Sequence, residues 1–443
     1  MASLKDKKGK SDDVPLGNSP SGLLSSLSDY FLPETVYFYS FPSGDSSGFF
    51  NQVPPWKEEL VSARPLIYAG EKVKVITYAS AVEGDAWDLV TNHLSMPVID
   101  RSRIVVLPKE ITSDIFGNKR NELVKLALKT LLPEKSLMMA QPLLDEEIRS
   151  KYQIDPALIV KLNDKINRGL YTNKKYLPKE YKTFKTGKEF SESTDVYPFP
   201  CVAKVSSSSA GDGVRICKNK EDIERAKKDF TNIKGDIIVE EFIHSIKNLG
   251  IQFAVSPNKN KEIEILGYSK QLTTEEGEYL GGVVNMDDNM KFLNKIYSVL
   301  LEEMLPLIRS WGWYGIGGID VLIDKDEEIF FIDPNFRMTA ASSYILLNKN
   351  KKLPHPIVSF SGLFRGTKED FIKKIVPIAK EGTGDQILKI IAITKTKDFY
   401  GLNAGLFFDD YANLREHVKK LLSLGIEANV LNKINSSNDM HLG

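Results

Sequence analysis

The segment "EEIFFIDPNFR" (residues 327–337) places polar side chains directly after an apolar run. Residues 329–332 are apolar, and Asp333, Asn335 and Arg337 follow them. A carboxylate and an amide offer the hard oxygen atoms that Mg²⁺ prefers, and a guanidinium can contact two anionic oxygens at once. The pattern predicts metal and phosphate chemistry at this strand end. The alternative is that Asp-Pro-Asn is only a turn signal.

Asp320 is the second acid of this hypothesis. It lies in "GIDVLI", an apolar stretch in which an unpaired carboxylate is costly to bury. Residues 318–333 have the pattern of a hairpin that turns at 324–327, which places Asp320 near residues 331 and 332. Asp320, Asp333 and Asn335 then converge at one end of the hairpin as candidate ligands of Mg²⁺.

The loop "SSSSAGDG", from Ser206 to Gly213, is a candidate phosphate-binding loop. Its small residues let backbone N–H groups approach phosphate oxygens, and Lys204 on the preceding strand supplies a mobile positive charge. No Gly-Lys-Ser/Thr follows, so the loop is not a Walker A motif. A flexible hairpin tip is the alternative interpretation. The loop residues assigned to the nucleotide are Ser208, Ser209, Gly211 and Gly213.

The strand "DIIVEEFI" (236–243) ends in a mixture of acidic and apolar residues. Such a strand end can offer a carboxylate and backbone groups to the edge of an adenine ring, with apolar side chains against its face. The candidate residues are Glu240, Phe242 and Ile243. An ordinary amphipathic strand end is the alternative.

The elements that must position these residues begin with an α/β domain that extends to about residue 150. Its helical pattern covers 120–132, with Leu123, Leu126 and Leu128 on the buried face. No glycine fingerprint follows the first strand, so a dinucleotide-binding domain is unsupported. The predicted strands are 35–41, 66–69, 73–79 and 103–108.

Further strands and helices follow. Residues 155–183 have a helical pattern that leads to a proline-broken connector, and residues 290–310 also look helical. After about residue 355, the stretch "YANLREHVKKLLSLG" is an amphipathic helix closed by Gly425. The predicted strands of this part are "FPCVAKV", "VRICK", "DIIVEEFI", "IQFAVS", "IEILGYSKQLT", "DQILKIIAITKT" and "FYGLNAGLFFDD".

Length and composition indicate a globular protein of two or three domains. The chain has 443 residues, of which 42% are hydrophobic, and its 59 basic and 59 acidic residues cancel. The overall charge therefore gives no argument for nucleic acid or an anionic membrane. A charged N-terminus and the absence of a long apolar run predict a cytoplasmic protein with no membrane partner.

The two cysteines lie on either side of the candidate phosphate loop. Pairing Lys204 with Val214 in a hairpin sets Cys201 near Cys217. Cytosolic thiols at such positions are usually small buried hydrophobic groups, and their spacing is not that of a zinc site. We assign them no function.

In combination, the phosphate loop with its lysine, the adenine-type strand end, and the paired acids with an asparagine resemble the ATP-grasp superfamily over residues 155–345. The resemblance implies mixed α/β and α+β structure, with ATP held between two subdomains of a central ATP-grasp domain. An N-terminal α/β domain and a small C-terminal α/β module flank it. The implied boundaries are 1–30 for a disordered tail, 31–150, 151–354 and 355–443.

The resemblance also implies roles for individual residues. Lys165 in "LNDKINRGL" matches the first phosphate lysine and Lys204 the second. Glu240 would accept from the adenine amino group, and the backbone near Phe242 and Ile243 would read the ring edge. Arg337 matches an arginine near the transferred phosphoryl group.

Three positions depart from the family pattern or extend it. The second metal acid is usually glutamate, and here it is Asp333. The acid that often holds the ribose is missing, with Asn248 as a substitute. Lys270 in "GYSKQLT" would add charge near the γ-phosphate.

The implied activity is that of an ATP-dependent carboxylate–amine ligase that uses Mg²⁺, with Mn²⁺ as an alternative ion. It would join a small-molecule carboxylate to an amine or peptide through an acyl phosphate. The layout and the segment "GLNAGLFFDD" also look like the pheganomycin-type peptide ligases. A kinase of small molecules and a nucleotide-binding module without turnover are the alternatives. The C-terminal module would shape the amine site or form a homodimer contact.

Overall fold

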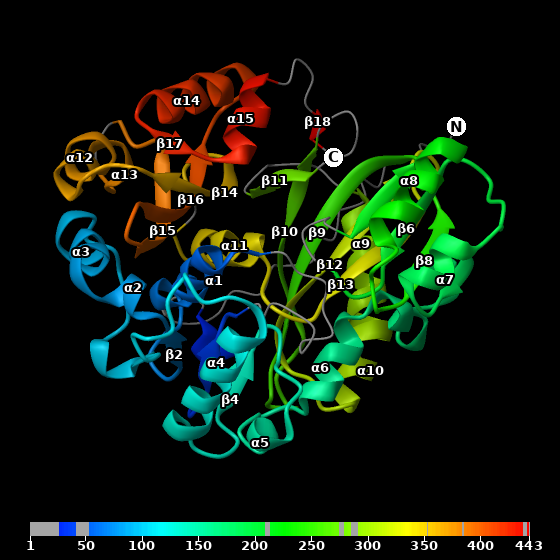
Figure 1. Ribbon diagram of the computed structural model, residues 1–443, viewed down its shortest axis with the longest axis horizontal. Helices are drawn as coiled ribbons and strands as arrows, with labels where there is room; N and C mark the ends of the chain where they lie inside the picture. The colour runs from blue at the N-terminus through cyan, green and yellow to red at the C-terminus, as the bar shows by residue number, and fades with distance from the viewer. Residues whose placement is uncertain are drawn as a thin grey trace, which may run out of the picture.

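The computed structural model describes residues 26–40, 53–208, 213–273, 279–284, 291–351, 353–382, 385–436 and 441–442. Three sheets organise this part of the chain (Figure 1). No helix in it is long and apolar enough to cross a membrane. The mixed α/β and α+β class predicted from the sequence is confirmed.

The N-terminal sheet is parallel and has the strand order β3-β2-β1-β4. Its strands are β1 (Val36–Phe38), β2 (Lys74–Thr77), β3 (Ile104–Val106) and β4 (Leu137–Met139). The helices of this region are α1 (Pro55–Ser62), α2 (Ala79–Val82), α3 (Gly84–Asp88), α4 (Gly117–Leu131) and α5 (Glu146–Arg149). The carboxyl ends of its strands meet at one edge, as in other parallel sheets.

Three predictions for this region were wrong. The run at 66–69 is not a strand, because Arg64–Ile67 forms a 3₁₀ helix (η3) around Pro65. The predicted tail ends before residue 30, since Leu27 is fully buried and begins a short 3₁₀ helix. On α4, Val124, Ala127 and Leu128 form the buried face, and the Leu126 side chain is 60% exposed on the opposite side.

A second, antiparallel sheet carries the candidate phosphate loop, in the order β5-β8-β6-β7. Cys201 pairs directly with Cys217, as the predicted hairpin requires, and both thiols are buried and free. Its elements are β5 (Glu180–Phe184), α7 (Gly187–Glu192), β6 (Cys201–Val205), β7 (Val214–Cys217), α8 (Lys220–Phe230) and β8 (Ile237–Glu241).

The largest sheet continues from the centre of the molecule into the C-terminal part. Its main path is β13-β12-β9-β10-β11-β14-β16-β15. The strands are β9 (Ser245–Val255), β10 (Glu264–Thr273), β11 (Tyr279–Val284), β12 (Gly315–Asp324), β13 (Ile329–Asn335), β14 (Ile357–Phe364), β15 (Leu388–Lys395), β16 (Tyr400–Phe407), β17 (Ile426–Glu427) and β18 (His441–Leu442). The C-terminal strands thus extend the central sheet through the β11–β14 pair.

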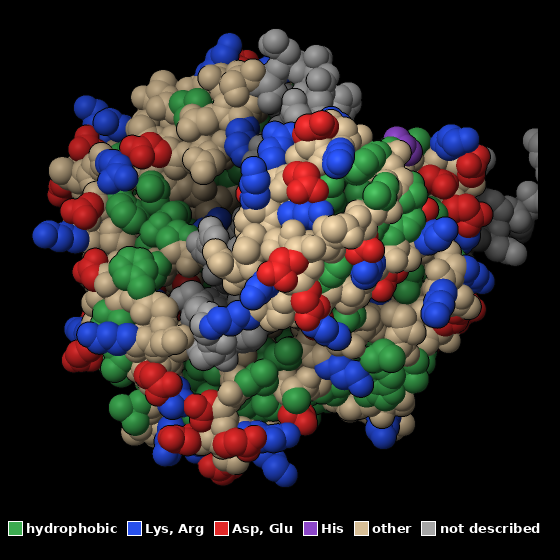
Figure 2. Space-filling model, turned by 45° about the vertical axis from the view of Figure 1, so that its right-hand side comes forward, with side chains coloured by type: hydrophobic (Ala, Val, Ile, Leu, Met, Phe, Trp, Pro, Cys, Tyr) green, Lys and Arg blue, Asp and Glu red, His purple; other side chains and the backbone are tan. Residues whose placement is uncertain are grey.

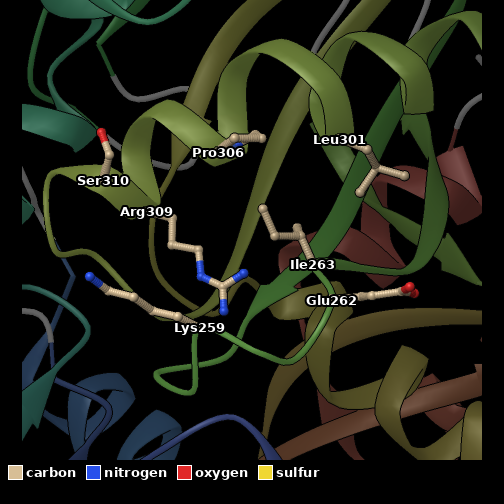
Figure 3. A pocket seen from close by; sticks show the side chains of 7 residues that line it. All are labelled: Lys259, Glu262, Ile263, Leu301, Pro306, Arg309 and Ser310. Carbon is tan, nitrogen blue, oxygen red and sulfur yellow. The ribbon is translucent and has the colours of Figure 1, made fainter.

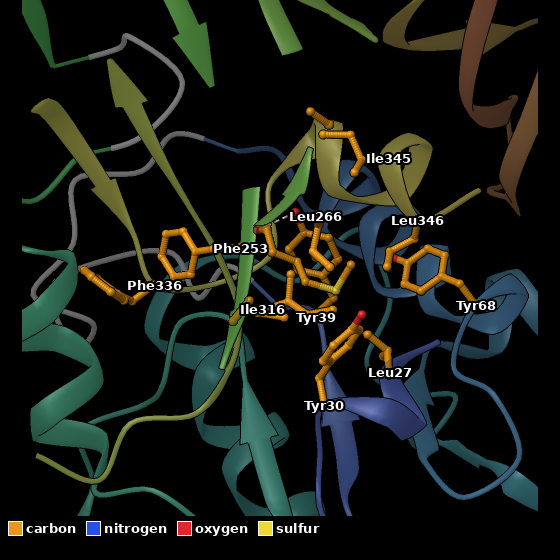
Figure 4. Close-up of a cluster of buried hydrophobic side chains, with 14 of the residues drawn as sticks. Leu27, Tyr30, Tyr39, Tyr68, Phe253, Leu266, Ile316, Phe336, Ile345 and Leu346 are labelled. Atoms are coloured by element: carbon orange, nitrogen blue, oxygen red, sulfur yellow. Dashed lines mark hydrogen bonds between the residues drawn. The ribbon is translucent and has the colours of Figure 1, made fainter. Parts of the chain in front are cut away.

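Helices pack on this large sheet from several segments of the chain. They are α6 (Pro156–Asn163), α9 (Lys291–Ser298), α10 (Leu305–Ser310), α11 (Ala340–Lys351), α12 (Lys368–Lys374), α13 (Val376–Ala379), α14 (Tyr411–Ser423) and α15 (Asn429–Ser436). A buried cluster joins the N-terminal region to the central strands, with Tyr39 and Tyr68 beside Phe253, Ile316 and Leu346 (Figure 4). This shared core holds the N-terminal sheet against the sheet that carries the two candidate metal acids.

Candidate active site

The β12–β13 hairpin brings the two candidate acids together. It turns between Asp324 and Glu328, as predicted, and Val321 pairs with Phe331. The register then shifts, because Ile332 forms a β-bulge, and Asp320 pairs directly with Asp333. Residues that pair directly across two strands lie on the same face of the sheet, so the two carboxylates face one site.

The Asp320 carboxyl lies in an environment that disfavours its charge. Burial and the negative charge of Asp333 raise its pKa to about 8, although Lys165 and Arg337 oppose this shift. A divalent cation would reverse this preference, because it stabilises both carboxylates in their charged form. The donor set therefore fits Mg²⁺.

The backbone beside Asp320 leaves room for a bound group. Gly250 pairs with Asp320 on β9, and a Cβ atom there would lie 3.4 Å from Asp320 Oδ1 and 3.0 Å from Ser269 Oγ. Asn335 pairs with Gly318, two residues along from the acid pair and on the same face. The predicted metal set of Asp320, Asp333 and Asn335 is therefore brought together.

Lys165 connects this acid pair to the candidate phosphate loop. It lies in a 3₁₀ helix, η6 (Lys165–Leu170), and its side chain is buried. Its Nζ lies 2.9 Å from Asp333 Oδ1 and donates to the Ser208 carbonyl at 3.0 Å. The ammonium group thus lies between the predicted metal site and the loop.

Lys204 contacts a buried cluster of charges that the sequence did not reveal. Its Nζ pairs with Glu240, and Arg168 Nη2 pairs with the other oxygen of Glu240 at 2.6 Å. Burial and the nearby positive charges of Arg168 and Lys165 lower the pKa of Lys204 to about 8, against the opposing effect of Glu240. Both oxygens of Glu240 are therefore used by cations.

This arrangement gives Glu240 a role that the sequence did not predict. Although burial alone would raise its pKa, the charges of Lys204 and Arg168 keep it below the ordinary value. Glu240 is therefore the counter-ion of both cations, and because a carboxylate has further lone pairs, its predicted contact with the adenine amino group stays a prediction. Arg168 follows Lys165 by three residues on η6, and this K-x-x-R spacing was the available sequence signal.

Comparisons with known proteins identify the family that part of this chain resembles. Residues 180–335 match the family described as L-aspartate–L-methionine ligase, ATP grasp. That match covers the phosphate-loop sheet, the adenine-type strand end and the acid hairpin. The matched part of the chain is an ATP-grasp domain.

Two curated ATP-grasp relatives and one solved structure illustrate the similarity. The 2-oxoglutarate carboxylase small subunit of Hydrogenobacter thermophilus is 24% identical over 163 residues, which are 32% of this chain and 30% of that protein. The formate-dependent phosphoribosylglycinamide formyltransferase of Wolinella succinogenes is 24% identical over 290 residues, 63% of this chain and 70% of that protein. The chain thus spans less than a third of the first relative's length.

The solved structure is an N5-carboxyaminoimidazole ribonucleotide synthetase in complex with ADP. It aligns with a TM-score of 0.52 at 11% identity and covers 90% of this chain and 98% of the other. This likeness is one of fold. It confirms the ATP-grasp architecture expected from the motifs.

Arg337, two residues beyond the matched domain, lies next to the acid pair. Its side chain is buried, and Nη1 donates to Asn163 Oδ1 at 2.7 Å. Burial lowers its pKa, and the negative charges of Asp333 and Asp320 oppose that shift. The guanidinium is therefore positioned by the end of α6 and faces the acids electrostatically.

The predicted adenine residues lie at the end of β8. Phe242 and Ile243 are half-buried and follow Glu241, the last residue of that strand. Asn248 lies on β9 opposite Leu322, and so on the same face as Asp320, two residues away from Gly250. Its Oδ1 is buried with no hydrogen-bond partner in the described structure. An orphaned acceptor on the site face is compatible with a ligand hydroxyl.

Lys270 does not lie where the sequence placed it. On β10, Ser269 pairs with Gly250 and shares the Asp320 face, so Lys270 points to the opposite face beside Leu249. The predicted contribution of its charge near the γ-phosphate stays a prediction. Gln271, its neighbour, donates to Asp320 and is a site residue that we missed.

The phosphate loop is described only in part. Ser209 and Gly211 lie outside the described residues. Ser208 is buried, and its hydroxyl donates to the Val205 carbonyl at 3.1 Å. A Cβ atom on Gly213 would lie 2.6 Å from Ser208 Oγ, so the close approach here requires glycine.

Two surface features lie outside this constellation. A groove lined by Lys259, Glu262 and Arg309 runs between the β9–β10 turn and α10 (Figure 3). It contains none of the predicted site residues. On the face shown in Figure 2, a hollow separates two parts of the molecule, and Lys and Arg side chains gather at its upper rim. Such a rim would favour an anionic ligand.

Proposed function

We propose that this chain is an ATP-dependent carboxylate–amine ligase that forms an amide bond through an acyl phosphate. The observation that carries the proposal is the convergence of Lys165, Asp320, Asp333 and Arg337 at one site. Phosphoryl transfer requires chiefly positioning and charge neutralisation, and these residue types supply both. ADP in the related synthetase structure supports a nucleotide at this site.

In this proposal, Lys165 and Lys204 bind phosphate oxygens of ATP. Asp320, Asp333 and Asn335 would hold Mg²⁺ or Mn²⁺, which neutralises phosphate charge when bound. Before the nucleotide binds, Lys165 pairs with Asp333 and Lys204 pairs with Glu240. These acids balance the charges of the two lysines.

Arg337 would orient the substrate carboxylate. A carboxylate oxygen attacks the γ-phosphorus, the bond from phosphorus to ADP breaks, and an acyl phosphate forms. The amine nitrogen then attacks the acyl carbon, loses a proton, and displaces inorganic phosphate. A guanidinium can make two parallel hydrogen bonds to the oxygens of the acyl phosphate. ADP, phosphate and an amide are the products.

The substrates proposed are amino acids or small peptides. The matched family is described as an L-aspartate–L-methionine ligase, and one relative is named for a formate-dependent reaction on a glycinamide. Both descriptions combine an acid with an amine. The likeness to pheganomycin-type peptide ligases stays a narrower prediction of the same class.

A phosphate-release screen tests the proposal. The full chain, ATP and Mg²⁺ are combined with amino acids and small acids as donors and with amino acids as acceptors, and ADP is distinguished from AMP. We expect ADP and inorganic phosphate only when an acid and an amine are both present, and none from Asp333→Ala. AMP release would contradict the mechanism. ADP formation with phosphate retained on the product would identify a kinase, and tight ATP binding without ADP a non-catalytic module.

A further inference from the structure

Arg64 is a buried arginine without a carboxylate partner among the described residues. Its side chain belongs to η3 and is 5% exposed, and its Nε has no hydrogen-bond partner in the part of the chain that the structure describes. The other buried arginines differ. Arg120 pairs with Glu58 and Glu59, Arg168 pairs with Glu240, and Arg337 faces Asp333.

An uncompensated charge in a protein interior is strongly destabilising. A chain retains such a group most readily where a ligand supplies the missing opposite charge. The group that best complements a planar guanidinium is a carboxylate or a phosphate, which accepts two parallel hydrogen bonds. Arg64 therefore points to an anionic ligand.

Neutral hydrogen-bonding groups surround Arg64. Its guanidinium lies 5.6 Å from the centroid of the Tyr39 ring and donates to that residue. Burial raises the pKa of Tyr39, Tyr68 and Tyr344, and the positive charge of Arg64 opposes the shift in all three. Arg64 is thus close to three tyrosines, and no acid among the described residues pairs with it.

Several buried polar groups in this region of the structure also lack partners among the described residues. The Tyr344 hydroxyl on α11, the Tyr37 hydroxyl on β1 and both amide atoms of Gln141 are buried with no hydrogen-bond partner in the described structure. Leaving such groups unsatisfied in the interior is destabilising. A ligand with several acceptor oxygens would satisfy the hydroxyls and the amide nitrogen.

The position of this cluster connects it to the candidate active site. Tyr39 follows β1 and Gln141 follows β4, so both lie at the carboxyl edge of the parallel sheet, where ligands bind in such folds. The Tyr39 hydroxyl donates to the Met338 carbonyl at 2.9 Å, the residue after Arg337. The cluster therefore lies next to the proposed acyl phosphate site.

We propose that Arg64, with Tyr39, Tyr344 and Gln141, recognises a substrate carboxylate other than the one that is activated. The proposal rests on the proposed function, because that function defines which carboxylate reacts. The second carboxylate belongs either to a dicarboxylic donor or to the amino acid that serves as the amine. Arg64 would then determine which substrates bind, with no direct part in the bond-forming steps.

Binding measurements with two matched pairs of probes test this proposal without turnover. The full chain with Mg²⁺ and a non-hydrolysable ATP analogue is titrated with L-aspartate and L-asparagine, and with L-methionine and L-methioninamide. We expect the carboxylate member of at least one pair to bind ~30-fold or more tightly than its amide, as for one partner of a buried charge pair. The first pair reports on the donor, and the second on the amine.

Arg64→Gln should remove this preference and leave affinity for the ATP analogue within about threefold, and Arg64→Lys should restore part of it. Without ligand, Arg64→Gln should not lower the melting temperature, because it removes a buried charge that has no acidic partner among the described residues. An unchanged preference, or equal losses for acid and amide, would overturn the proposal. So would the absence of any preference in the wild-type chain.

Tyr344→Phe is a second variant that keeps the test decisive if Arg64→Gln does not fold. It removes one unpartnered hydroxyl, so stability should hold while affinity for the carboxylate probe falls by roughly threefold to tenfold. Tyr400→Phe is the matched control, because its hydroxyl bonds to Asp85 away from this cluster. Equal effects of the two tyrosine variants would contradict the assignment. Probe binding that depends on Arg64, without phosphate release, would reject the ligase function but retain this site.

Discussion

Asp333 lies directly opposite Asp320 because Ile332 is an extra residue in β13. In a regular hairpin, Ile332 would pair with Asp320, and Asp333 would pair with Ile319, which belongs to the buried core. The bulge therefore moves the Asp333 carboxylate from the core face to the site face. The Ile332 carbonyl, displaced by the same bulge, accepts from Arg168 at 3.1 Å.

Replacing Asp333 with asparagine should lower the turnover rate by roughly 10²–10³-fold, the usual loss for one electrostatic group at a reacting centre. The variant keeps the shape of the side chain and removes the charge that the metal needs. Phosphate release measures the effect. Asp326→Asn on the hairpin turn is the control, since that side chain is exposed. Full activity of Asp333→Asn would reject the metal assignment.

Arg337→Ala should abolish turnover but retain more nucleotide affinity than Asp333→Ala. The guanidinium is assigned to the acyl phosphate, whereas the carboxylate is assigned to the metal that accompanies ATP. Calorimetric titration with an ATP analogue and Mg²⁺ separates the two losses. If both variants lost nucleotide affinity equally, Arg337 would belong to the nucleotide site.

Glu240→Gln should destabilise the fold by about 3–5 kcal/mol, because it leaves Lys204 and Arg168 buried together without their counter-ion. Urea unfolding measures this loss. Glu328→Gln is the matched control, since Glu328 pairs with Lys295 at the surface and is 59% exposed. Its cost should stay below about 1 kcal/mol. Similar costs for both variants would contradict the counter-ion role.

Affinity for the ATP analogue should fall as the pH rises above about 8. Burial lowers the pKa of Lys204 to about 8 in the free protein, so the side chain carries its charge below that pH and loses it above. Anionic phosphates bind the charged form, and binding above pH 8 therefore requires uptake of a proton. The dissociation constant should rise by up to roughly tenfold per pH unit there. Lys204→Arg, which stays charged, should flatten this profile.

Gly250→Ala should weaken binding of the metal–nucleotide pair by roughly tenfold or more, as for other residues that position metal ligands. Its Cβ atom would lie 3.4 Å from Asp320 Oδ1 and 3.0 Å from Ser269 Oγ and would occupy the space beside the carboxylate. Gly235→Ala is the control, because its Cβ atom would meet nothing within 4 Å. Titration with Mg²⁺ at a fixed concentration of analogue compares the two. Equal affinities would show that this space is not used.

The sequence determined the residue types of the site and several local elements. The hairpin turn at 324–327 and the pairing of Cys201 with Cys217 follow from local patterns, because turn chemistry and strand composition act over a few residues. The order of the motifs along the chain was enough to predict a resemblance to the ATP-grasp superfamily. The hairpin predicted from the sequence also placed Asp320 and Asp333 at the same end.

Only the tertiary structure decided which face each of these residues occupies. Strand alternation places Lys270 on the face opposite Asp320 and Gln271 on the same face as Asp320. A single bulge places Asp333 directly across from Asp320. Side chains alternate between the two faces of a strand, so one residue of register reverses every contact. The pairing of Glu240 with Lys204 and Arg168, and the position of Arg64 with no acidic partner among the described residues, result from the packing of distant segments. No local sequence pattern encodes that packing.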